Sequence, residues 1–113
     1  FVDQVVGTGM LMLVVLAVSD QRNMSLSTSL GPIVVGASVT LIGMTYGLNA
    51  GYAINPARDF GPRLFTYIAG WGEQVFTAHD HWWWVPIAGP LTGAVVGGLV
   101  YDLLITRHHP PAK

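Results

Sequence analysis

Residues 51–63 read Gly-Tyr-Ala-Ile-Asn-Pro-Ala-Arg-Asp-Phe-Gly-Pro-Arg, and they are the most informative stretch of this sequence. Asn55 is a preferred helix N-cap, and Pro56 suits the first helical position because its missing N–H would have no intrahelical partner there. The pattern predicts a short helix from Asn55 to about Ala69, ended by Gly-Trp-Gly and preceded by an extended segment over residues 49–54.

Around this stretch the chain is apolar and poor in charge. Half of its 113 residues are hydrophobic, with five Lys or Arg and six Asp or Glu, whereas about a quarter of the residues in a soluble domain are charged. No charge occurs between Asp3 and Asp20, or between Asp80 and Asp102. A bilayer-spanning helix needs roughly 20 apolar residues. We therefore predict an all-α, multi-pass membrane protein with transmembrane helices at about 1–18, 30–48 and 83–105.

The segment at about 49–70 is too polar to cross lipid, because it carries Arg58, Asp59 and Arg63. Irregular backbone at membrane depth is tolerated only where protein or a water-filled cavity surrounds it. These residues therefore predict a re-entrant half-helix whose capped N-terminus lies near the bilayer centre. The positive end of its dipole would repel cations, while the Asn55 amide could donate a hydrogen bond to a neutral oxygen.

The placement of charges and histidines bears on the orientation of the chain in the membrane and on other possible functions. Cations near helix ends put Arg22, Arg107 and Lys113 on one side, the cytoplasmic one. The net charge of −1 argues against nucleic-acid binding, and no residue spacing indicates a metal or cofactor site. The four histidines, at positions 79, 81, 108 and 109, could sense pH, but solvated loop histidines are more often bystanders.

The charged residues of the re-entrant segment each allow two interpretations. Arg58 can offer its donors to a polyol or a water chain, or it can form an ion pair with Asp59 or Asp102. Asp59 can contact solute or compensate charge locally. Tyr52 can line a pore or simply pack. An enzyme using Arg58, Asp59 and His81 is disfavoured because no nucleophile with a base is visible.

Residues 51–63, followed by Leu-Phe-Thr-Tyr-Ile-Ala-Gly-Trp-Gly, resemble the second-half signature of aquaglyceroporins, the glycerol-conducting branch of the major intrinsic protein family. The resemblance covers the whole chain and corresponds to the C-terminal half of such a channel. It implies six spans and two half-helices in an inverted repeat around one pore, with four pores per tetramer. This chain would hold three transmembrane helices and one re-entrant half-helix, which is half of the aquaporin-type inverted repeat.

The resemblance also implies roles for individual residues. Asn55, Pro56 and Ala57 would form the pore motif; the selectivity filter would include Arg58, Tyr52 and Gly43, and the backbone carbonyls of Asn49, Ala50 and Gly51 would line the pore. Asp59, Arg63, Pro86 and Ile87 match the glycerol branch. Water-selective relatives place histidine at the position of Gly43, so Gly43 would supply room for a larger solute.

One position departs from the family pattern, and one dipeptide departs from the rules for helix formation. Gln4 occupies a site where many aquaporins place glutamate, yet a neutral amide can still bond a loop backbone. Gly61-Pro62 would stop the short helix by residue rules, whereas the family pattern continues it.

These observations predict a passive, non-enzymatic channel for glycerol, water and other small neutral solutes such as urea, which excludes ions and protons. It would work with the N-terminal half of the same channel, as a homotetramer in the lipid bilayer of the plasma membrane. The alternative is a non-conducting half-channel fragment with a structural or regulatory role.

Overall fold

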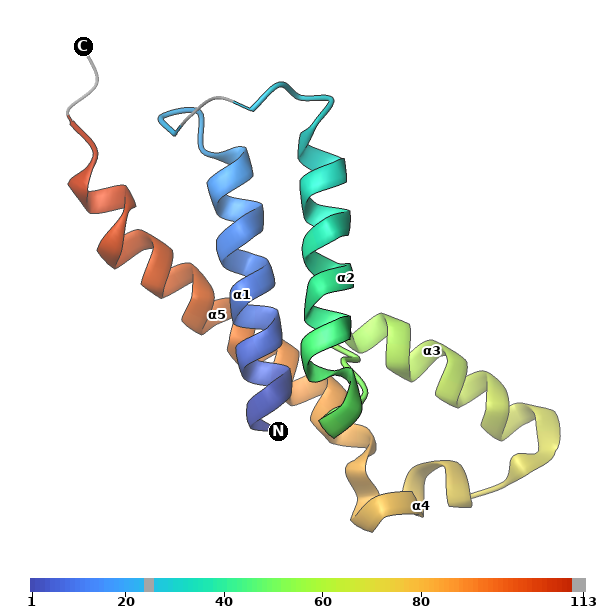
Figure 1. Ribbon diagram of the computed structural model, residues 1–113. Helices are drawn as coiled ribbons and strands as arrows, with labels where there is room; N and C mark the ends of the chain where they lie inside the picture. Colours follow the sequence, from blue (N-terminus) through green and yellow to red (C-terminus); the bar gives the residue numbers. More distant parts are fainter. Residues whose placement is uncertain (24–25, 111–113) are drawn as a thin grey trace.

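In the computed structural model, which describes residues 1–23 and 26–110, all regular secondary structure is helical. The elements follow the chain as α1 (Val2–Ser19), α2 (Gly31–Ala50), α3 (Pro56–Thr66), the π-helical turn η1 (Tyr67–Trp71), α4 (Gln74–His81), the 3-10 turn η2 (Trp82–Trp84), α5 (Val85–Leu104) and the 3-10 turn η3 (Thr106–His108) (Figure 1). The predicted all-α fold is confirmed.

Three helical stretches are long and apolar enough to cross a membrane: α1, α2 and residues 74–108, which contain α5. The helices α1 and α5 cross in close contact (Figure 1). Glycine makes the crossing possible, since a Cβ atom added to Gly97 would lie 2.5 Å from the Gly9 carbonyl oxygen. Gly98, one residue on, faces open space. The contact therefore depends on which face of α5 carries the small residues.

The half-helix α3 follows α2 through a short loop. Gly51 adopts φ +73° and caps α2 in the left-handed conformation, so α2 continues to Ala50 and the non-helical segment begins at Gly51 rather than at Asn49. α3 runs through Gly61-Pro62, as the family pattern implied, although Pro62 has no N–H to donate to the preceding turn. Its 11 residues correspond to about 16 Å, about half of a bilayer core.

The far end of α3 is held by an aromatic cluster where the sequence suggested only an outer loop. Phe76, in α4, lies with its ring centroid 5.5 Å from Tyr67 and 5.9 Å from Trp83, both in edge-on geometry. Phe60 of α3 lies 6.5 Å from the same ring. Such aromatic pairs stabilise beyond the area they bury, so α4 ties the half-helix to the start of α5.

The loop between α1 and α2 lies at the same end of the molecule as the C-terminal segment (Figure 1). Arg22 and Arg107 are therefore on one side, as the cation pattern predicts. Lys113, the third cation of that prediction, lies outside the described residues.

Candidate pore-lining site

The N-terminus of α3 is capped by Asn55, as predicted. The Asn55 side-chain oxygen accepts hydrogen bonds from the backbone N–H groups of Ala57 at 3.0 Å and Arg58 at 3.1 Å. The cap thus uses the amide oxygen. Within the described part of the chain the amide nitrogen has no hydrogen-bond partner, so it remains a donor beside the positive end of the helix dipole.

The loop before Asn55 has a strained backbone. Tyr52 adopts φ +26° and Ile54 φ +40°, and a β-branched residue rarely occupies positive φ. Such strain persists only where the surroundings enforce it. Here Gln4, 1% exposed, accepts from the Ile54 N–H at 2.8 Å, and Thr8 donates to the Ile54 carbonyl at 3.5 Å. The α1 helix therefore sets the shape of this loop.

Gln4 also donates to the Ala50 carbonyl at 3.3 Å, so its amide joins α1 to both ends of the loop. The expectation that a neutral Gln bonds the loop backbone is confirmed. α5 packs against the base of the same side chain, because a Cβ atom at Gly89 would lie 2.6 Å from the Gln4 Cβ. Thr8 was missed by the sequence reasoning, although it lies four residues after Gln4 and hence on the same helix face.

Arg58 is held by the loop and not by an acid. One guanidinium nitrogen donates to the Tyr52 carbonyl at 2.9 Å and to the Ala53 carbonyl at 3.3 Å, and the guanidinium carbon lies 4.8 Å from the Tyr52 ring centroid. Asp59 pairs with Arg63, and Asp102 with Arg107. The alternative in which Arg58 pairs with Asp59 or Asp102 is therefore wrong, and the remaining donors of Arg58 are available to a ligand.

The Tyr52 ring lies over two glycines of α2. A Cβ atom at Gly43 would come within 2.9 Å of the Tyr52 Cζ atom, and one at Gly47 within 3.1 Å of its Cδ1 atom. Gly43 therefore leaves room for the tyrosine ring. That it also leaves space for a larger solute stays a prediction. Gly47 lies four residues after Gly43 and hence on the same face of α2.

The three predicted filter residues share one hollow. Gly43, Tyr52 and Arg58 line an open pocket of about 390 Å³, together with Val39, Thr40 and Met44. A neighbouring pocket of about 180 Å³ also includes Arg58, with Gly51, Ala53 and Asp59. Together the lining combines apolar side chains, among them the Tyr52 ring, with the guanidinium donors of Arg58. That arrangement suits a small solute with one carbon edge and one hydroxyl edge.

Asp59 and Arg63 form a bidentate ion pair one helical turn apart, with distances of 2.8 Å and 3.1 Å. Local charge compensation by Asp59 is therefore confirmed. Arg63 also donates to the Val75 carbonyl at 2.8 Å and so fastens α3 to α4. Pro86 is fully buried at the start of α5, and Ile87 beside it is half-buried. That these four positions mark the glycerol branch stays a prediction.

The remaining predicted positions are placed without a test of their role. Asn49 and Ala50 end α2, where carbonyls lack intrahelical partners, and the Ala50 carbonyl is engaged by Gln4. Their function as pore-lining acceptors, with Gly51, stays a prediction. His79 and His81 lie at the end of α4, His108 is exposed, and His109 contacts Asp20. No cluster able to hold a metal occurs among the described residues.

We predict that Gln4→Leu destabilises the protein by about 1–3 kcal/mol, because it leaves the Ile54 N–H and the Ala50 carbonyl buried without partners. Gln4→Glu keeps an acceptor for Ile54 and should cost less. Thermal unfolding of the full-length protein in detergent, followed by scattering and tryptophan fluorescence, measures both variants against wild type. A leucine variant as stable as wild type would show that other contacts hold the loop.

Comparison with known proteins defines the class of this molecule. Residues 1–101 match the family model described as major intrinsic protein. The chain therefore belongs to the major intrinsic protein family.

Individual relatives agree with this assignment. The chain is 54% identical to human aquaporin-10 over 97% of its own length and 36% of the relative, and 52% identical to human aquaporin-9 over 97% of its length and 37% of the relative. It also superposes on the crystal structure of the aquaglyceroporin from Plasmodium falciparum with a TM-score of 0.87 and 38% identity, covering 93% of this chain and 43% of that one. The chain is thus homologous to aquaglyceroporins and spans little more than a third of the aquaporins it matches.

Proposed function

We propose that this chain forms one wall of a pore that conducts glycerol, water and other small neutral solutes such as urea, and excludes ions and protons. The observation that supports the proposal best is the pocket in which Gly43, Tyr52 and Arg58 meet beside the capped N-terminus of α3. Named relatives of the chain are aquaporins and an aquaglyceroporin, and a non-enzymatic role at the level of the family accords with them.

The pocket suits passage rather than storage of a solute. Arg58 and the free amide nitrogen of Asn55 supply donors, and Tyr52 supplies an apolar wall. We propose the carbonyls of Asn49 and Gly51 as acceptors, since the Ala50 carbonyl already accepts from Gln4. Each polar contact replaces one to water, so a neutral hydroxyl solute crosses at low cost. A cation meets both the guanidinium charge and the positive end of the α3 dipole, so it is repelled.

A complementary half is needed to close this pore. No residue of α3 is buried. Phe65, on the same short helix as Arg58, and Ile68, in the turn η1 that follows, are each 73% exposed. Lipid can cover the apolar side chains but not the charged Arg58, since polar groups facing hydrocarbon cost several kcal/mol each. We propose that the N-terminal half of the same channel covers this face, within a multi-pass homotetramer of the plasma membrane.

Stopped-flow light scattering of proteoliposomes that carry the full-length protein tests the proposal. In a glycerol gradient the vesicles should shrink and then reswell, whereas in a sucrose gradient they should only shrink. We further expect that residues 1–113 alone conduct no glycerol above background, and that co-expression with the upstream half restores the reswelling.

The alternative function, a non-conducting half-channel with a structural or regulatory role, is favoured by one observation: the pocket lined by Gly43, Tyr52 and Arg58 is open. It predicts no reswelling in the glycerol gradient even when both halves are present. Reswelling with residues 1–113 as the sole protein would contradict the need for a complementary half and would indicate a pore built from identical copies.

A further inference from the structure

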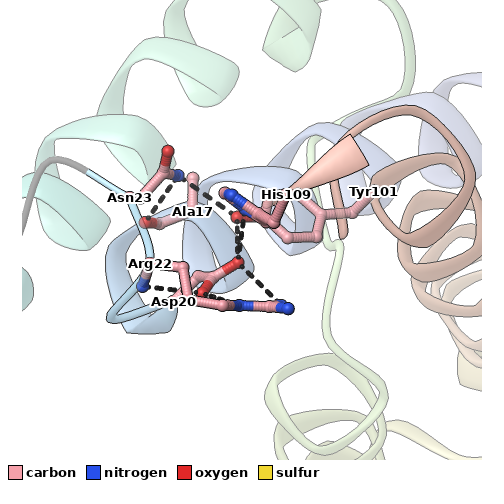
Figure 2. Close-up of polar contacts among 6 residues, drawn as sticks. All are labelled: Ala17, Asp20, Arg22, Asn23, Tyr101 and His109. Carbon is pink, nitrogen blue, oxygen red and sulfur yellow. Dashed lines mark hydrogen bonds and ion pairs between the residues drawn. The ribbon is translucent and has the colours of Figure 1, made fainter. Parts of the chain in front are cut away.

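The C-terminal segment folds back against the end of α1, far from the candidate pore. After α5 the turn η3 brings His109 to Asp20, the C-cap residue of α1, with 3.2 Å between the imidazole Nε2 and the carboxylate Oδ2 (Figure 2). Both side chains are largely shielded, with 14% and 10% of their surface exposed. The two residues are 89 positions apart in the chain, so their contact joins the tail to the loop between α1 and α2.

The Asp20 side is a fixed anion. Its carboxylate accepts from the Arg22 side chain at 3.1 Å and 3.3 Å and from the Arg22 backbone N–H at 3.0 Å. The hydroxyl of Tyr101, from α5, donates to the same carboxylate at 3.2 Å and accepts from the Asn23 amide at 3.2 Å (Figure 2). The hydrogen bonds from Arg22 lower the pKa of Asp20 to about 2. Asp20 therefore stays charged at every pH a cell experiences.

The His109 side is not satisfied in the same way. Its Nε2 atom is buried, and within the described part of the chain it makes no hydrogen bond of good geometry, in spite of its short distance to Asp20. A neutral imidazole gains little here, because a hydrogen bond weakens steeply when it is poorly aligned, whereas ionic attraction depends mainly on distance. A protonated imidazole instead forms an ion pair with the carboxylate, and histidine is the side chain that ordinarily changes charge between about pH 5 and pH 8.

Other charged groups near His109 do not replace this contact. Arg107 pairs with Asp102 of α5 at 2.9 Å, so it does not compete for Asp20. Arg22 does share the carboxylate, but its side chain is 51% exposed and its charge is screened by water. The ionisable groups placed around His109 by the loop, by α5 and by the tail are Asp20, Arg22, Tyr101, Asp102, Arg107 and His108.

We propose that the contact between His109 and Asp20 is a proton-dependent latch on the C-terminal segment. Protonation of His109 holds residues 106–110 against the start of the α1–α2 loop, and loss of that proton releases them. The latch controls how accessible the tail is to other proteins, at the end of the channel where Arg22 and Arg107 lie. It does not depend on which solute the pore conducts.

Trypsin cleavage after Arg107 reports the latch directly, because the protease must unfold η3 and pull His109 away from Asp20 to reach that bond. The full-length protein in nanodiscs is digested at about pH 8 and about pH 5.5, and fragments that begin at His108 are quantified by mass spectrometry. Each rate is divided by the rate on a free peptide of residues 102–113 with the same substitution at the same pH. This removes the effect of pH and of sequence on trypsin itself.

For wild type we expect the normalised cleavage rate to fall about fivefold at the lower pH. This is the effect expected when a partly exposed charged contact stabilises the closed tail. His109→Gln should be cleaved rapidly at both pH values. His108→Gln is the matched control: it changes the neighbouring exposed histidine and should behave as wild type. The proposal is overturned if wild type shows no slowing at low pH, if His109→Gln keeps the slowing, or if both variants lose it.

Discussion

Replacing Arg58 with valine is expected to open the pore to protons and cations. Loss of one positive charge close to the path lowers the barrier to cations, so the leak rates should rise about tenfold or more. The guanidinium is the one cation of the described chain that lines the pocket with Gly43 and Tyr52. It also ties the Tyr52 and Ala53 carbonyls of the strained loop. The variant therefore removes both the repulsive charge and a clamp on the loop, and the ratio of glycerol to water flux should change as well.

Vesicle pH measured with an entrapped dye, together with stopped-flow solute fluxes, follows both effects. Arg58→Lys separates them, because an ammonium keeps the charge but cannot reproduce the planar set of donors. It should still exclude cations while its flux ratio shifts. Arg107→Val is the control, since Arg107 lies in the tail and pairs with Asp102. A well-folded Arg58→Val with wild-type pH stability and fluxes would remove Arg58 from the filter.

A combined change at Gly43 and Tyr52 is expected to turn the pore toward water. Gly43→His alone must displace the tyrosine ring, since even its Cβ atom would lie 2.9 Å from the Tyr52 Cζ atom. The single variant should therefore lose flux of both solutes. Adding Tyr52→Ala frees that space, and the imidazole then narrows the opening while it keeps a donor for water. The glycerol-to-water flux ratio of the double variant should fall about tenfold, or about 1.4 kcal/mol in relative barrier.

The two positions should be non-additive, because they are in contact. Stopped-flow measurement of wild type, both single variants and the double variant completes the cycle. Recovery of water flux in the double variant would show that the loss in Gly43→His comes from its clash with Tyr52. Equal glycerol and water losses in all three variants, or strictly additive effects, would place the filter elsewhere.

Most of the architecture follows from local features of the chain. Long intervals without charge predict the spans, and the ends of the three long helices lie within two residues of the predicted bounds. At the end of α2 the difference arises because Gly51 in the left-handed conformation lets the helix continue to Ala50. Asn55-Pro56 starts α3 by hydrogen bonds to residues two and three positions away. The continuation of α3 through Gly61-Pro62 was the exception, since helix rules opposed it and only the family pattern predicted it.

The sequence by itself therefore determined the three long helices, the capped half-helix and the family, because these depend on local hydrogen bonding, on apolar length and on a motif of adjacent residues. Only the tertiary structure decided where side chains meet across the chain. Tyr52 lies over Gly43 and Gly47, Arg58 binds loop carbonyls instead of an acid, and Gln4 holds Ile54 from 50 residues away. The strained loop has no local reason for its shape; buried hydrogen bonds from α1 impose it, and such distant partners leave no periodic signal in the sequence.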